Sequence, residues 1–451
     1  MNGLEIVLAA VALIWGGVVL YRGGLLGGCL LVMLAAVCFS HPFFTLPAGP
    51  VALTADRVLW AVLVVQYLVW RRLGLAQPKP WAKAEIALLA FFGVLVASTF
   101  LHDWQARRSQ PLVQLVLLYA MPLGMYWIAR DTRLSQRGIL ALFGLAGLLA
   151  IYLAVTAWAE TRELWWLVYP KYIASSEHQE YLGRGRGPFL NPAACGLYQG
   201  VGMAALLMGW PRANRFGRGL LLAGCALVCV GIYSTLTRCA WLGAGLGLVV
   251  LLGLTLPGRW RVPLVAAVTI SAVLAAATQW ERLMSFKRDR SLDAQQAAES
   301  ARLRPILATV AWHMFLDRPL AGCGFGQYLQ ESRPYFSDRS TDLPLEKARP
   351  FVQHNVLLAL LVETGLLGAG LFLSMLLLWA RDAWRLCRAA PAPLWARQQA
   401  LLLLVTMAGY LANGMFQDVA MIPTVNMLLF FMAGLTASLR HLAEPELNWS
   451  S

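Results

Sequence analysis

His354 and Asn355 begin an apolar stretch, HNVLLALLVETGLLG, that is long enough for a membrane helix and carries one carboxylate, Glu363. An imidazole titrates near neutral pH, and a titratable group at the edge of a membrane helix is costly to place there. His354 is therefore a candidate general base, and a helix-start or interfacial role is the alternative. Glu363 lies about 13 Å further along a straight helix and on nearly the opposite face. We interpret Glu363 as a buried polar residue that holds neighbouring helices together.

Four arginines in the same part of the chain could bind an anionic group. Arg184 and Arg186 alternate with glycines in GRGRGPFLNP, just before Asn191, and Arg238 lies in STLTRCAW between two apolar segments, whereas Arg304 lies in a long loop. A guanidinium fits phosphate oxygens, and glycine lets backbone approach a ligand. Lipid phosphates are an alternative partner for the first pair, and a protein carboxylate for Arg238. The pattern favours chemistry on a lipid-anchored, anionic substrate.

The composition indicates a helical membrane protein. Apolar residues make up 59% of the 451 positions and charged residues 13%, against about 25% charged residues in soluble domains. The short alternating segments of a membrane β-barrel are absent. The eight cysteines are scattered, which favours small buried apolar side chains over a metal site or disulfides.

Hydropathy predicts an all-α polytopic protein, with roughly 20 apolar residues in each span. We expect about 12 or 13 transmembrane helices in a single membrane domain over residues 1–451, the smaller number applying if the first two form a partial hairpin. The predicted spans are 4–21, 24–44, 51–70, 84–101, 111–129, 138–158, 193–210, 219–236, 239–256, 262–278, 354–379, 397–413 and 422–439.

Arginine and lysine positions predict the orientation, because short cytoplasmic loops are enriched in both residues. One set of short loops is basic and is assigned to the cytoplasm. The opposite face receives the segments 160–192 and 279–353 and the tight connection at Arg238. Residues from about Ala294 to Leu316 change from polar to apolar, which suits a helix lying along the membrane interface.

The net charge of +14 is explained by the membrane and does not require a nucleic-acid partner. Basic cytoplasmic loops set the topology and suit anionic lipid headgroups. The outward segments contain no His/Cys cluster or paired acidic motif suited to a metal, and the cytoplasmic loops contain no Walker loop. We therefore expect chemistry without a metal or another cofactor.

Four motifs together resemble the O-antigen ligase and polymerase superfamily. They are GRGPFLNP, STLTR, PLAGCGFG and the His354–Asn355 pair with Glu363, Gly365 and Gly368. The resemblance covers roughly residues 184–368. It implies a multi-pass glycosyltransferase of the C-type architecture in the bacterial inner membrane, with a large periplasmic loop (here 279–353) and a second periplasmic loop at 160–192. Such enzymes transfer a glycan from undecaprenyl pyrophosphate to an acceptor hydroxyl, which in the ligase branch belongs to the lipid A core.

The resemblance also implies roles for individual residues. His354 matches the histidine that activates the acceptor hydroxyl. Arg184 or Arg186, together with Arg238, match arginines that hold the pyrophosphate, and Arg304 matches a further basic position. Asn191, Asn355 and Glu363 would support the site. Because pyrophosphate is already a good leaving group, the enzyme mainly has to position the reactants and stabilise charge, and direct attack by the hydroxyl would invert the anomeric carbon.

Other functions fit parts of the sequence. An O-antigen polymerase or a protein O-oligosaccharyltransferase would use the same chemistry on a different acceptor. A transporter of lipid-linked glycans would favour inverted repeats and charges at mid-membrane, whereas the strongest polar residues here gather at one face. A structural subunit would explain the spans but not the candidate site. The ligase branch is favoured.

Overall fold

The computed structural model is all-α. It describes residues 16–18, 21–39, 43–46, 51–107, 109–175, 177–178, 180–263, 266–268, 270, 274, 278, 294–338, 340–349 and 351–443, with the side chains of 294–302 outside the description. Within these ranges the regular elements are helices, and Leu46 and Leu53 form an isolated antiparallel bridge. The predicted all-α polytopic membrane architecture is confirmed.

Within the described ranges, seven helices are long and apolar enough to cross a membrane. They are α4 (Lys83–Leu101), the continuous stretch Pro111–Arg130, α7 (Gln136–Thr161), α8 (Pro192–Met208, counted to Arg212), α9 (Arg215–Ser234), α10 (Arg238–Thr255) and α14 (Val356–Arg388). The other helices at predicted spans are α2 (Gly24–Cys38), α3 (Ala55–Arg72), α15 (Leu394–Gly414) and α16 (Pro423–Ser438). The predicted spans 4–21 and 262–278 lie largely outside the described residues.

Helix α8 lies among α7, α9, α10 and α15, and most of its residues are buried. A side chain at Gly202 would collide with Ala150 of α7, and one at Gly196 with Ala240 of α10. Small residues of this kind let membrane helices approach closely, since burial from water does not drive their association in lipid. The helices that carry the loops around Arg184 and Arg238 are therefore closely packed together.

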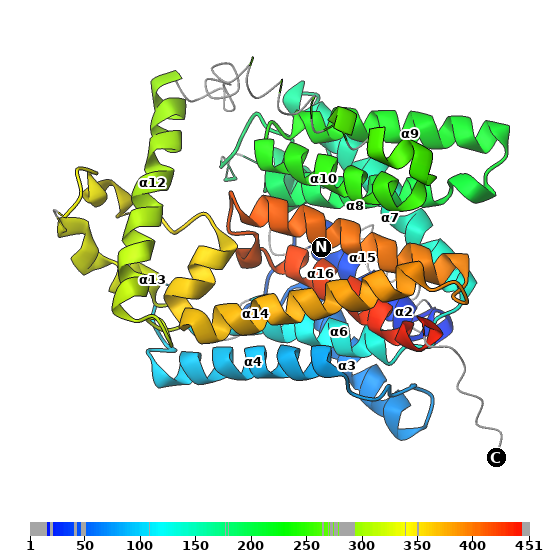
Figure 1. Cartoon of the computed structure of the whole chain (residues 1–451), viewed down its shortest axis with the longest axis horizontal. Coiled ribbons are helices and arrows are strands. Elements are labelled where there is room, and N and C mark those ends of the chain that lie inside the picture. The colour runs from blue at the N-terminus through cyan, green and yellow to red at the C-terminus, as the bar shows by residue number, and fades with distance from the viewer. Residues whose placement is uncertain are drawn as a thin grey trace, which may run out of the picture.

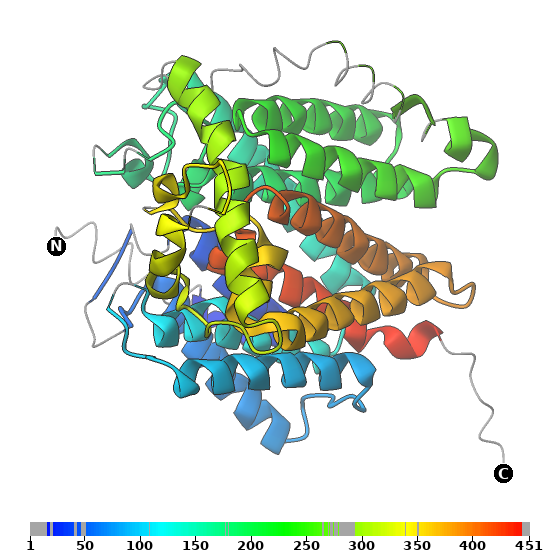
Figure 2. The same ribbon diagram turned by 60° about the vertical axis from the view of Figure 1, so that its left-hand side comes forward.

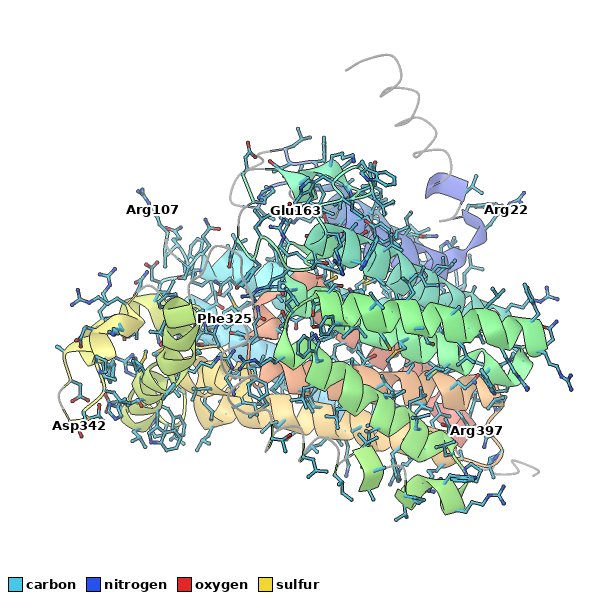
Figure 3. All side chains as sticks on the ribbon, turned by 90° about the horizontal axis from the view of Figure 1, so that it is seen from above. Arg22, Arg107, Glu163, Phe325, Asp342 and Arg397 are labelled. Carbon is cyan, nitrogen blue, oxygen red and sulfur yellow. The ribbon has the colours of Figure 1, made fainter. Side chains whose placement is uncertain are left out.

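Helix α12 (Ala294–Asp317) runs across one end of the helix bundle, with the short helix α13 (Tyr328–Glu331) beside it (Figures 1 and 2). Figure 3 shows Phe325 and Asp342 towards this end and Arg397 at the opposite end. The described part of the segment 279–353, which its sequence assigns to the outward face, therefore lies at one end of the helix bundle.

Helix α14 is kinked at Gly365, where φ is +63°. The turn formed by residues 319–326 packs into the kink and completes its backbone hydrogen bonds. The amide of Leu366 donates to the carbonyl of Pro319 (2.8 Å), and the amide of Cys323 donates to the carbonyl of Val362 (2.8 Å). Non-helical backbone at membrane depth is tolerated only where protein satisfies it in this way. Gly322, Gly324 and Gly326 all have positive φ, so the GxGxG string forms this turn.

Candidate active site

His354 lies in the loop just before α14 and is half-buried. The next residue, Asn355, caps the helix, because its Oδ1 accepts a hydrogen bond from the amide of Leu358 (3.0 Å). Its Nδ2 donates to the carbonyl of Met415 (3.1 Å), at the end of α15. These contacts tie the residue that follows His354 to the start of α14 and to the end of α15.

The environment of His354 favours the neutral imidazole. Burial lowers the pKa of His354 below its ordinary value, and the positive charge of Arg304 lowers this pKa further. A neutral imidazole can accept a proton, which is what a general base requires.

Arg304 brings positive charge both to this histidine and to Arg238, and the three residues belong to separate elements. The exposed guanidinium of Arg304, on α12, lies 5.7 Å from the ring centre of Phe416. Its charge acts on both His354 and Arg238, and Arg238 is the half-buried first residue of α10. Arg304 therefore lies within electrostatic range of both His354 and Arg238, and we call these three residues the His354 cluster. Two guanidinium groups close enough to repel each other are suited to a shared anion.

Arg184 lies beside the turn that precedes Arg238. The amide of Gly185 donates to the carbonyl of Ser234 (2.8 Å), the last residue of α9. A side chain at position 185 would come within 2.5 Å of the Cβ atom of Ala157, so the close approach requires glycine. Arg184 itself is buried, with its guanidinium 5.1 Å from the ring centre of Tyr181.

Arg186 does not fit the predicted pyrophosphate contact. The side chain is fully buried, and its Nε lies 3.2 Å from a carboxylate oxygen of Glu160 on α7. Its Nη1 donates to the carbonyls of His178 (2.6 Å) and Glu180 (2.9 Å), and its Nη2 donates to the carbonyl of Ile173 (2.8 Å). Since these contacts occupy four of the five N–H donors of a guanidinium, Arg186 holds the 171–187 loop in shape.

The remaining predicted residues also make contacts within the protein. Asn191 caps α8 by accepting from the amides of Ala193 (3.0 Å) and Ala194 (3.1 Å). The backbone carbonyl of Glu363 accepts a hydrogen bond from the amide of Gly324 (3.0 Å). Glu363 thus ties the 319–326 turn to the helix that His354 precedes.

Two residues near the site escaped the sequence analysis. Glu160, the partner of Arg186, lies at the end of α7, and a lone carboxylate at the edge of a membrane span is a signal that could have identified it. Phe416, under Arg304, follows α15. Nothing in the local sequence distinguishes Phe416 from other apolar residues.

Fold and site together define a multi-pass membrane protein with a basic, histidine-containing cluster at one end of its helices. Residues 223–373 match the family model described as O-Antigen ligase, and this match confirms the resemblance to the O-antigen ligase and polymerase superfamily. The matched region contains Arg238, Arg304 and His354 but neither Arg184 nor Arg186. It supports a glycosyltransferase of the O-antigen ligase type, or a related one, that uses a lipid-linked glycan and an acceptor. Among curated proteins, none shows a significant match to the chain.

Proposed function

We propose that this protein transfers a glycan from undecaprenyl pyrophosphate to a sugar hydroxyl of the lipid A core, at the periplasmic face of the inner membrane. The observation that carries the proposal is the His354 cluster, in which Arg304 lies within electrostatic range of both a half-buried histidine and Arg238, and each of the three comes from a separate element. The glycosyltransferase class comes from the family match, and the ligase branch from the sequence motifs.

In the proposed reaction the acceptor oxygen attacks the anomeric carbon of the glycan as His354 removes the hydroxyl proton. The bond between the anomeric carbon and the phosphate oxygen breaks, and undecaprenyl pyrophosphate leaves with the electron pair. Direct displacement inverts the anomeric carbon. Arg238 and Arg304 neutralise the charge that grows on the leaving group, and Arg184, in the neighbouring loop, contributes to the same task. The loops and helices that carry these residues are positioned by Arg186, Asn191, Asn355 and Glu363.

A reconstituted transfer assay tests the proposal. Purified protein in lipid vesicles would receive undecaprenyl-pyrophosphate glycan and lipid A core, with and without a chelator. We expect a glycan-capped lipid A core that forms despite the chelator and is lost in His354→Ala. His313→Ala is the matched control, because His313 pairs with Asp338 (2.9 Å) elsewhere on α12.

The product identifies the acceptor. Longer glycans still attached to undecaprenyl pyrophosphate would assign the protein to the polymerase branch, and a glycosylated protein would assign it to the oligosaccharyltransferases. Transfer that survives in His354→Ala would remove the proposed mechanism.

A further inference from the structure

A cavity of about 260 Å³ lies between the start of the Pro111–Arg130 stretch and the start of α16. The side chains of Ser109, Gln110 and Gln114 give it polar walls, and Leu117, Leu118 and Met421 give it apolar ones. Among the residues that the structure describes, none that lines the cavity is charged. The volume equals roughly nine water molecules at about 30 Å³ each, which is room for one sugar residue.

The hydroxyl of Ser109 indicates that the cavity takes a polar ligand. Ser109 is only 9% exposed, and its Oγ makes no hydrogen bond within the described part of the chain. A buried hydroxyl without a partner is unfavourable, so a ligand that could hydrogen-bond to it would be stabilised. A lipid tail would fill the space but leave this hydroxyl unpaired.

The walls of the cavity are held in place before any ligand binds. Asn426, which is 1% exposed, donates through Nδ2 to the carbonyl of Leu118 (2.9 Å) and to the carbonyl of Ala420 (2.8 Å). These bonds join the π-helix η1 (Leu115–Ala120) to the segment that carries Met421. A third bond, from Gln114 Nε2 to the carbonyl of Ser109 (2.7 Å), fixes one of the polar side chains. Ligand sites are usually preformed in this way.

The loop 415–423 connects the cavity to the candidate active site. At its beginning, Met415 accepts the hydrogen bond from Asn355, and Phe416 lies under Arg304. Towards its end, Met421 lines the cavity. Pro111, next to the polar walls, packs against the 319–326 turn, because a side chain at Gly326 would come within 2.9 Å of it.

We propose that this cavity is a subsite for one neutral sugar residue of the substrate glycan. The inference rests on the proposed function. Hydroxyl and amide groups can exchange hydrogen bonds with sugar hydroxyls, and the apolar walls suit the C–H faces of the ring. The described lining residues are uncharged, which distinguishes this subsite from the arginines that would hold the pyrophosphate.

The first test measures binding without turnover. His354→Ala protein in nanodiscs would be mixed with glycan released by mild acid from the source organism's own lipid-linked and surface polysaccharides, and binding would be followed by saturation-transfer NMR. Val113→Trp should fill the cavity and abolish the signal, whereas Val116→Trp, on the same helical stretch but outside the lining, should keep it. Ser109→Ala, a variant that barely disturbs folding, should weaken binding roughly two- to tenfold.

Equal signals in the Val113→Trp and Val116→Trp proteins would overturn the inference. The inference would also be overturned if native mass spectrometry detected a bound phospholipid in the wild-type and Val116→Trp proteins but not in Val113→Trp. If glycan binding needs the cavity but the wild-type protein shows no transfer in the reconstituted assay, the subsite is kept and the proposed function is rejected.

The second test identifies which substrate supplies the sugar. In the transfer assay, Ser109→Ala should raise the KM for one substrate roughly two- to tenfold and leave kcat and the other KM unchanged. A raised KM for the lipid-linked glycan assigns the subsite to the donor, and a raised KM for the lipid A core assigns it to the acceptor. Unchanged KM values for both substrates would overturn the inference.

Discussion

His354 should act as a base at a lower pH than a free imidazole, whose ordinary pKa is about 6.5. Burial and the charge of Arg304 both lower the pKa of His354, so the imidazole stays neutral as the pH falls. The acid limb of kcat/KM should therefore lie below pH of about 6.5. In Arg304→Gln the electrostatic contribution of the arginine disappears, so the pKa of His354 should rise and the acid limb should move to higher pH. Burial still lowers the pKa of His354 in this variant, so the pKa should stay below its ordinary value.

A pH series of initial transfer rates in both proteins checks this expectation. Arg318→Gln is the control, since Arg318 pairs with Glu331 (3.0 Å) at an exposed position outside the His354 cluster. If the acid limb of Arg304→Gln lies at the wild-type pH, Arg304 does not influence the pKa of His354. This conclusion holds whether or not the KM for the donor changes.

The contribution of Arg238 to transfer should depend on the shape of its guanidinium as well as on its charge. Lysine keeps the charge but cannot form two parallel hydrogen bonds to phosphate oxygens. Losing one hydrogen bond to a charged group costs about 1.5–3 kcal/mol, so Arg238→Lys should lower kcat/KM for the donor roughly ten- to hundredfold. Arg215→Lys is a matched control, because Arg215 is also the first residue of a helix but belongs to the opposite end of α9. Wild-type activity in Arg238→Lys would remove Arg238 from the pyrophosphate site.

The limits of prediction at this scale are clear from Arg184 and Arg186. Both residues lie between glycines in the sequence, and no local property separates them. The structure separates them because Glu160, on α7, and three carbonyls surround Arg186. Such partners depend on how helices pack. The His354 cluster likewise draws its residues from three elements that are far apart in the sequence. Family motifs could group these residues, whereas their spacing along the chain could not.

At the scale of elements, hydropathy predicted helix positions well because it is a local property. The predicted spans 84–101 and 138–158 correspond to α4 (Lys83–Leu101) and α7 (Gln136–Thr161). Hydropathy did not reveal the π-helix within Pro111–Arg130 or the kink in α14. The kink exists because the 319–326 turn supplies hydrogen-bond partners from outside the helix, and a hydropathy profile contains no such information.

The kink at Gly365 should be required for the site. With φ at +63°, this position is unfavourable for other residues, and a side chain would collide with the backbone of Leu320. Gly365→Ala should therefore displace the 319–326 turn, lower the thermal unfolding temperature and reduce transfer. Gly370→Ala, in the same helix with open space around it, should behave like wild type. Thermal unfolding in detergent and transfer rates would be compared, and equal behaviour of the two variants would show that the turn does not depend on the kink.

At the scale of the whole molecule, a buried group of charges lies far from the candidate active site. Glu85, near the start of α4, is 0% exposed and lies 3.3 Å from Arg130 and 3.1 Å from Arg440. Arg440 also lies 3.1 Å from Asp382 of α14. The other end of α4 carries Ser98, whose hydroxyl accepts from the amide of Phe325 in the 319–326 turn (2.9 Å). At 1.5 Å per residue, about 20 Å separates Glu85 from this contact.

Glu85 should therefore be required for stability and not for chemistry. Glu85→Gln would leave two buried or half-buried arginines without their shared carboxylate, and breaking a buried ion pair costs about 3–5 kcal/mol. We expect a clear fall in the thermal unfolding temperature, with an unchanged KM for both substrates in the protein that remains folded. Arg381→Gln removes a partner of Asp382 that is 43% exposed, and such surface pairs contribute only about 0–1 kcal/mol. If both variants unfolded at the wild-type temperature, the charge group would not hold α4, α14 and the end of α16 together.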